Sequence, residues 1–263
     1  MRLSLSSGTA QSGDPPPRHS WLSLPGLCCQ AAGGDPHAAD RVAAAWVLLY
    51  TAAHLFDCVQ DGDPADPWWQ ALGPGPAINV ATGLLTSAWL VLAQLGVHRP
   101  VVQQLIQDFQ QTVLQMASGQ HVDLTDPQPS LHTAWTIAEA KSGAFFALAC
   151  RSGARLAGAP QAASEHYAEY GLNLGLIVQI GDELEDLHAG RSAPPLPVAY
   201  CREMALGADD GGAQLYLATK LAQFRARALD SLDAAGGAQP AKDQLAELIC
   251  SLVPEFEAIP NYG

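Results

Sequence analysis

The chain has 263 residues, a formal net charge of −13 and a pI of about 4.8, with 15% charged and 48% hydrophobic residues. Its acidity argues against nucleic acid as the main partner, because a phosphate backbone needs Lys and Arg to displace its counterions. The low charge content is typical of a helical bundle in which most helices are largely buried.

The N-terminal segment and the cysteines indicate a cytoplasmic protein. Residues 1–17 lack the apolar segment of a secretory signal and are predicted to be a disordered arm, followed by one helical domain over residues 18–263. The six cysteines form no CxxC pair and have no zinc-site spacing, so we expect them to be reduced. They are Cys28, Cys29, Cys58, Cys150, Cys201 and Cys250.

Glycine and proline residues divide the chain into helices. A short first helix is expected to end at residues 33–36. Longer helices are expected at residues 37–61, 77–95, 100–117, 130–156 and 161–187. The intervening loops are placed at residues 63–76, 125–129, 158–160 and 190–197, and two or three further helices are separated at Gly236-Gly237. No segment alternates polar and apolar residues as a strand would, so the sequence predicts an all-α domain.

Two apolar stretches have the composition of a membrane span. Residues 42–56 are too few to cross a bilayer comfortably, and polar residues such as Asn79, Thr86 and Gln94 interrupt residues 77–97. Both stretches are therefore predicted to be buried core helices, and no transmembrane segment is expected.

Two acidic motifs share one spacing. Asp57 and Asp61 end one long helix, and Asp182 and Asp186, with Glu183 between them, lie near the end of another. Residues four apart share a helix face, and like charges there repel, so a pair within apolar sequence needs a cation. Because Mg²⁺ is commonly held by one or two carboxylates and substrate phosphates, the motifs predict a diphosphate bound through magnesium. The alternative, acidic residues facing solvent at helix ends, is more plausible for one motif alone than for two.

The settings of these motifs resemble a known family. Residues 171–186 closely resemble the second aspartate-rich region of polyprenyl (isoprenyl) diphosphate synthases, with Glu183 in place of the second aspartate. Residues 54–63 resemble the first such region. Asp57 and Asp61 are kept there, Cys58 replaces the middle aspartate, and Asp63 matches a further acid.

Three further segments follow in the family's order over about residues 20–260. Residues 119–124 resemble its GQxxDL segment, residues 141–143 its Lys-Thr/Ser-Gly motif, and Gly190-Arg191 with Leu196-Pro197 the connection after the second acidic region. The resemblance implies a helical bundle around a central cavity, a homodimer, and three Mg²⁺ ions with substrate bound. It implies Asp57, Asp61, Asp182, Glu183 and Asp186 as metal ligands. It also implies Lys141, Gln120, Gln179 and Arg191 as substrate-binding residues.

The chain departs from the family at the second substrate site. Chain-elongating members bind isopentenyl diphosphate through basic residues near the N-terminus and an Arg-Arg pair after the first motif. Here His19 and Trp21 stand at the N-terminal positions, and residues 67–70 (PWWQ) replace Arg-Arg-Gly. A diphosphate without magnesium needs direct cations, preferably arginine, so this second site lacks its main ligands.

Three functions remain open. The first is a Mg²⁺-dependent prenyltransferase of isoprenoid biosynthesis, acting on an allylic prenyl diphosphate with Asp57, Asp61, Asp182 and Lys141 as catalytic residues. The second is a class I terpene cyclase that ionises a single prenyl diphosphate. The third is a catalytically silent binding or regulatory subunit, which Cys58 and the missing arginines permit.

Overall fold

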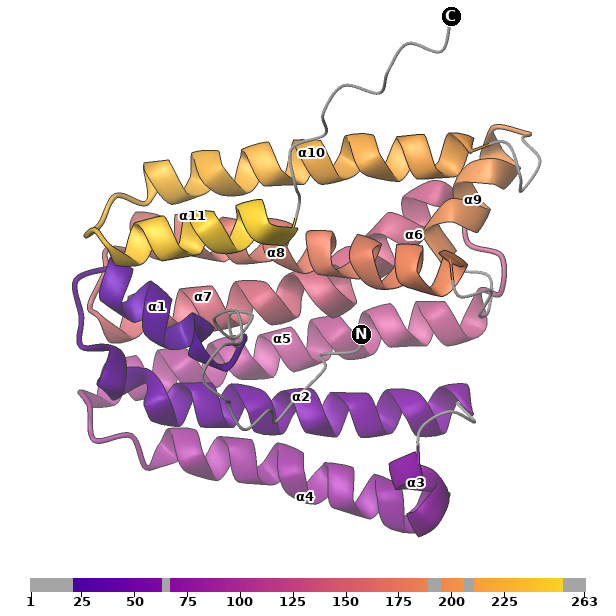
Figure 1. Ribbon diagram of the computed structural model, residues 1–263. Helices are drawn as coiled ribbons and strands as arrows, with labels where there is room; N and C mark the ends of the chain where they lie inside the picture. The colour runs from indigo at the N-terminus through magenta and orange to yellow at the C-terminus, as the bar shows by residue number, and fades with distance from the viewer. Residues whose placement is uncertain (1–20, 63–66, 189–194, 206–210, 253–263) are drawn as a thin grey trace, which may run out of the picture.

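The computed structural model describes residues 21–62, 67–188, 195–205 and 211–252, and these contain helices and no β-strand (Figure 1). The all-α prediction is confirmed, while the predicted arm at residues 1–17 lies outside the described part. The α-helices are α1 (Leu24–Ala31), α2 (Asp40–Asp61), α3 (Pro67–Leu72), α4 (Pro74–Ala93), α5 (Arg99–Thr125), α6 (Leu131–Ala138), α7 (Ala144–Leu156), α8 (Gln161–His188), α9 (Pro195–Glu203), α10 (Gly212–Ala234) and α11 (Ala241–Leu252). Short 3₁₀ helices cover Trp21–Ser23 and Pro36–Ala39, and a π-helical turn, η3 (Glu139–Gly143), joins α6 to α7.

An aromatic cluster ties α2 to α7 in the centre of the bundle. Trp46 is 1% exposed and stacks on Phe145, with ring centroids 4.4 Å apart. Its indole N–H donates to the Phe145 carbonyl at 2.9 Å, so the one polar atom of the side chain is satisfied. The contact fixes α2 beside the start of α7.

Glycines let α8 approach α7 and η3 at backbone distance. A Cβ atom on Gly175 would lie 2.4 Å from the Ser142 carbonyl oxygen, and one on Gly171 would lie 2.5 Å from that of Phe146. Only glycine fits such contacts without a shift of the backbone. The glycine spacing of residues 171–175 therefore presses α8 against the turn that carries Lys141.

Proline and glycine account for the errors in the predicted helix boundaries. The loop expected at residues 63–76 is wrong from Pro67 onward, since α3 and α4 begin at prolines, and α9 likewise begins at Pro195, inside the loop expected at 190–197. Proline is compatible with the first turn of a helix because the N–H groups there have no helical partner. Helix α5 was expected to end at residue 117 but continues to Thr125. Gly119 lies within it and allows a close contact with Ala140. The break at Gly236-Gly237 is confirmed.

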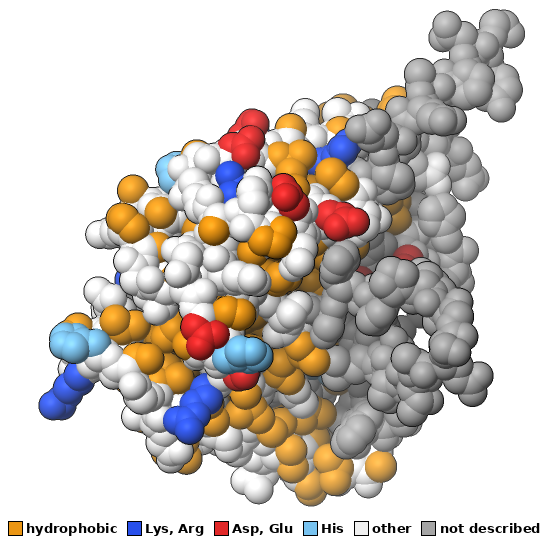
Figure 2. All heavy atoms as spheres, turned by 60° about the vertical axis from the view of Figure 1, so that its left-hand side comes forward, with side chains coloured by type: hydrophobic (Ala, Val, Ile, Leu, Met, Phe, Trp, Pro, Cys, Tyr) orange, Lys and Arg blue, Asp and Glu red, His pale blue; other side chains and the backbone are white. Residues whose placement is uncertain are grey.

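The two apolar stretches differ in burial. Two helical stretches, Pro36–Asp61 and Pro74–Ala93, are long and apolar enough to cross a membrane by length and composition alone, which the core helix of a globular protein also satisfies. Helix α2 buries residues along most of its length, whereas α4 buries only Ala77, Ala81, Ala88 and Leu92. The prediction of a buried core helix is therefore wrong for α4. Hydrophobic side chains remain on the surface at the lower part of Figure 2, the level at which α4 lies in Figure 1.

Substitution of Gly175 by alanine tests the contact between α8 and η3. We expect Gly175→Ala to lower the free energy of unfolding by about 1–3 kcal/mol, because the added methyl group overlaps the Ser142 carbonyl. Gly181→Ala on the same helix is the matched control, since a Cβ there meets nothing within 4 Å. It should stabilise the protein by roughly 0.5–1 kcal/mol through helix propensity. Urea denaturation measures both, and equal effects would contradict the close packing.

Candidate active site

A cavity of about 550 Å³ is lined by residues of α2, α4, α5, α6, η3, α7, α8 and α9. One part of its wall is apolar and includes Leu49, Phe56, Leu85, Met116, Ile137 and Phe145. Another part is polar and includes Asp57, Gln120, Asp123, Lys141, Gln179 and Glu183. Such a cavity suits an amphiphile with a hydrocarbon chain and a charged head group.

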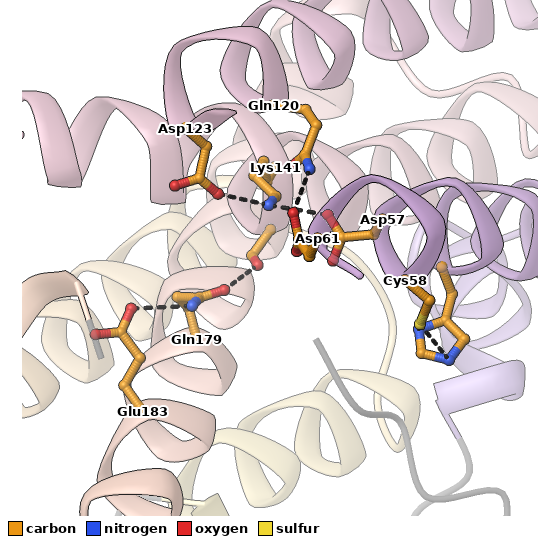
Figure 3. A network of polar contacts seen from close by, with 10 residues as sticks. Asp57, Cys58, Asp61, Gln120, Asp123, Lys141, Gln179 and Glu183 are labelled. Atoms are coloured by element: carbon orange, nitrogen blue, oxygen red, sulfur yellow. Dashed lines mark hydrogen bonds and ion pairs between the residues drawn. The ribbon is translucent and has the colours of Figure 1, made fainter. Parts of the chain in front are cut away.

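Lys141 joins three elements at the polar part of the cavity. Its Nζ atom lies 3.1 Å from Asp57 Oδ1 on α2 and 2.9 Å from Asp123 Oδ2 on α5 (Figure 3). Burial lowers the pKa of Lys141, but Asp57 and Asp123 together outweigh it, and the pKa is raised above its usual value. The lysine is therefore held as a cation between two carboxylates.

Asp123 is a site residue that the sequence reasoning did not single out. It follows Gln120 by three residues on α5, so the two side chains share a helix face. The signal was present in the GQxxDL-like segment, where the aspartate is the charged member. Its contact with Lys141 was not predictable from that segment alone, because Lys141 comes from a different element.

Asp57 and Asp61 form a pair of negative charges one helical turn apart. The Gln120 amide donates to Asp61 Oδ1 at 3.3 Å. Partial burial raises the pKa of Asp61, and so does Asp57, while Lys141 and Gln120 act in the opposite direction. The net direction for Asp61 is upward, so Lys141 and Gln120 do not fully offset the effects of burial and of Asp57 on this carboxyl.

Cys58 does not belong to this polar cluster. It is 4% exposed, its Sγ atom lies 3.7 Å from the His54 ring nitrogens, and it is absent from the cavity wall. Figure 3 shows it apart from the carboxylates. The middle position of the first motif thus faces the interior, and cysteine there leaves Asp57 and Asp61 in place.

In the second motif, Glu183 is the residue that reaches the cavity wall. It is 4% exposed, and its Oε1 and Oε2 atoms accept hydrogen bonds from the Gln179 amide at 3.0 Å and from the Leu196 backbone N–H at 2.9 Å. Burial raises the pKa of its carboxyl to about 7, although both hydrogen bonds act in the opposite direction. Gln179 in turn accepts a hydrogen bond from the Ser142 hydroxyl at 2.6 Å.

The structure brings together some of the predicted site residues and separates others. Asp57, Gln120, Lys141, Gln179 and Glu183 line the cavity, and Asp61 adjoins it through Gln120. Asp182 and Asp186 lie on α8, partly exposed and outside the cavity wall. Outside the described residues lie Arg191, Asp63, Arg18, His19 and the side chains of Trp68 and Trp69.

The carboxylates fit magnesium only in combination with other ligands. Among the described residues, no three His, Cys, Asp or Glu side chains lie close enough together to hold a metal ion. Magnesium usually keeps several waters and binds one or two carboxylates plus substrate phosphates. Asp57 and Asp61, four residues apart on α2, have the donor chemistry for such a partial site.

Comparisons with solved structures identify the fold. The structure resembles the geranylgeranyl pyrophosphate synthetase of the archaeon Geoglobus acetivorans, with a TM-score of 0.82, 19% identity, and coverage of 89% of this chain and 84% of that one. It also resembles the polyprenyl synthetase of Streptomyces coelicolor A3(2), with a TM-score of 0.79, 22% identity, and coverage of 89% and 84%. The helical bundle around a cavity is the isoprenyl synthase fold.

Sequence comparison identifies the family. The family model described as Polyprenyl synthetase matches residues 23–193, so the chain belongs to the polyprenyl synthetase family, and the resemblance found in the motifs is confirmed. The chain is 30% identical over 151 residues to the tryptophan prenyltransferase ComQ of Bacillus subtilis subsp. natto, covering 57% of this chain and 46% of that protein. It is 28% identical over 165 residues to a (2E,6E)-farnesyl diphosphate synthase of Mycobacterium tuberculosis, covering 60% and 45%. The match thus spans a little under half the length of these two relatives.

Neutralisation of Asp61 tests whether burial and the neighbouring Asp57 make its charge unfavourable in the metal-free protein. An acid whose pKa is higher in the folded than in the unfolded state lowers the stability of the protein when it is ionised. This loss is absent below the unfolded pKa, 3.8, grows as the pH rises, and is complete above the folded pKa. We therefore expect Asp61→Asn to raise the melting temperature of the metal-free protein at pH 7, with the gain vanishing as the pH falls below 3.8.

Two further measurements complete this test by thermal denaturation. Asp230→Asn, at an exposed position on α10, is the control and should change little. With Mg²⁺ and an inert prenyl diphosphate analogue present, the wild type should have a higher melting temperature than Asp61→Asn, because only the wild type keeps both carboxylates for the metal ion. A lower melting temperature for Asp61→Asn than for the wild type, at pH 7 and without metal, would contradict an unfavourable charge on Asp61.

Proposed function

We propose that this protein is a Mg²⁺-dependent prenyltransferase that ionises an allylic prenyl diphosphate. The observation that carries the proposal is the cavity whose wall combines apolar residues with Lys141 held between Asp57 and Asp123. The apolar wall would hold the isoprenoid chain and exclude water from the allylic cation. The charged groups would hold the diphosphate.

Each proposed role follows from the chemistry of the side chain. Asp57 and Asp61, together with Asp182 and Asp186 on α8, would hold magnesium ions. Bound magnesium would neutralise the charge that develops on the leaving diphosphate. Lys141 would exchange one of its carboxylate partners for a phosphate oxygen and stabilise the same charge. Gln120 would keep Asp61 in position through its amide, while the roles of Gln179 and Arg191 toward substrate rest on the family resemblance.

The charges around the cavity favour an acceptor other than isopentenyl diphosphate. Among the described residues that line the cavity, Lys141 is the only Lys or Arg. A second diphosphate would need several direct cations, since magnesium serves the first. Two acceptors avoid this need: a double bond of the same chain, as in a terpene cyclase, and an uncharged aromatic ring. The name of the Bacillus relative, a tryptophan prenyltransferase, supports the aromatic ring.

Homodimer formation is a further proposal that rests on the family resemblance. The exposed apolar residues Ile78, Val80 and Leu90 of α4 support it, because a second copy would remove them from water. The molar mass from light scattering tests it: a dimer is expected, and a monomer at micromolar concentration would contradict it.

One assay separates the proposed functions. The purified protein is incubated with Mg²⁺ and C10, C15 or C20 allylic diphosphates, each with isopentenyl diphosphate, with tryptophan, or with no added acceptor. We expect release of diphosphate that EDTA abolishes, and a product by mass spectrometry in an arm without isopentenyl diphosphate. Asp57→Asn should lower the rate at least about 100-fold, the size typical of losing an electrostatic catalytic group, and Asp230→Asn should not.

Two results would contradict the proposal in different ways. Absence of diphosphate release from every substrate would support the silent regulatory subunit. Efficient elongation with isopentenyl diphosphate would support an ordinary chain-elongating synthase and contradict the inference from the missing cations.

A further inference from the structure

Glu183 occupies a position in the second acidic motif but uses both carboxylate oxygens inside the protein. Oε1 accepts from the Gln179 amide on its own helix (Figure 3). Oε2 accepts from the backbone N–H of Leu196 on α9. Glu183 lines the cavity wall with 4% of its surface exposed, and turning its carboxylate further toward a metal ion would take it away from these two donors. Leaving a buried donor without its acceptor is unfavourable.

The Leu196 N–H lies in the first turn of α9, where backbone N–H groups have no helical partner. The first residues of α9 are Pro195, Leu196 and Pro197, and proline has no N–H group. Leu196 is therefore the one residue among these three with a backbone donor, and it is fully buried. A carboxylate at this point satisfies the donor and interacts favourably with the positive end of the helix dipole.

The same carboxylate is connected to the turn that carries Lys141. The Ser142 hydroxyl donates to Gln179 at 2.6 Å, and the Gln179 amide donates to Glu183 at 3.0 Å. Ser142 adjoins Lys141 in η3, where Gly175 of α8 contacts its carbonyl. A continuous series of hydrogen bonds thus runs from the start of α9 through α8 to η3.

We propose that Glu183 is a positioning residue and not a magnesium ligand: it fixes the start of α9 against α8 and, through Gln179 and Ser142, the turn that carries Lys141. The inference concerns the active site proposed above and rests on that proposed function. It also explains why glutamate replaces the aspartate of the family pattern. Aspartate is shorter by one methylene, about 1.5 Å, which would move its oxygens beyond hydrogen-bond distance of Leu196.

Two substitutions of Glu183 distinguish a positioning residue from a ligand, because the two roles predict opposite orders. Glu183→Gln keeps the length of the side chain but loses the charge that a metal ion needs. Its amide oxygen can still accept from the Leu196 N–H, and its amide NH₂ can donate to the Gln179 oxygen if the Gln179 amide rotates by 180°. Glu183→Asp keeps the charge but loses the reach. Magnesium affinity is measured by calorimetric titration in the presence of an inert prenyl diphosphate analogue, with the turnover rate measured in parallel.

The positioning role predicts that Glu183→Gln stays within about threefold of the wild type in magnesium affinity, well under one tenfold step. It predicts that Glu183→Asp lowers kcat about tenfold, because one hydrogen bond is lost, and that the magnesium affinity is unchanged. Asp182→Asn, at a proposed ligand, is the positive control for weakened magnesium binding. A tenfold loss of magnesium affinity in Glu183→Gln, with Glu183→Asp intact, would overturn the inference.

Amide hydrogen exchange at Leu196 gives a readout that needs neither metal nor substrate. Glu183→Asp should accelerate exchange of this amide about tenfold, while Glu183→Gln should leave it slow. Glu185→Gln, at an exposed glutamate of the same motif, is the matched control and should have no effect. Unchanged exchange in Glu183→Asp would overturn the anchoring role. This result stands by itself, so a protein without diphosphate-releasing activity would refute the proposed function and still report on Glu183.

Discussion

The arrangement of the site depends on one ammonium group, that of Lys141, held between Asp57 and Asp123 with side-chain exposures of 25%, 29% and 28%. A largely buried lysine would lose its proton without such partners, and two adjacent carboxylates would repel each other without the lysine. The three residues come from η3, α2 and α5, so the ion pairs can form only when these elements are brought together. A substrate phosphate bound at this site would be a third anion, and it would compete with the two carboxylates for the same ammonium group.

The packing that places Lys141 is unusually close. Glycines on α8 allow its backbone to contact η3 and α7. Trp46 of α2 stacks on Phe145, which follows η3 in the chain, and donates a hydrogen bond to its carbonyl. The hydrogen bonds from Ser142 through Gln179 to Glu183 add a polar link on the other side of the turn. Apolar packing and polar links thus act on the same five-residue turn, which favours a fixed position for the lysine over a mobile one.

Features encoded within one helix were predictable from the sequence, and features that join elements were not. The acidic pairs at i, i+4 were found because helix geometry alone relates their residues. The Lys-Ser-Gly segment was found through its resemblance to the family's motif. The contact of Glu183 with Leu196 was missed because the chain leaves α8 and returns as α9 before the two meet. Likewise, the helix expected at residues 100–117 was placed too short, since the close approach of Ala140 that requires Gly119 within α5 comes from η3. The replacement of aspartate by Cys58 looked damaging in the sequence, but the structure places that position inside the protein, next to His54.

We propose that Lys141 and the carboxylates beside it form a magnesium-dependent site for a diphosphate. Calorimetric titration of an inert prenyl diphosphate analogue into the wild type and into Lys141→Met, each with and without Mg²⁺, tests it most directly. We expect binding that requires Mg²⁺ and that Lys141→Met weakens by about 10- to 100-fold, as expected for one charge-assisted hydrogen bond. Binding of equal strength without Mg²⁺, or binding that Lys141→Met leaves unchanged, would contradict it.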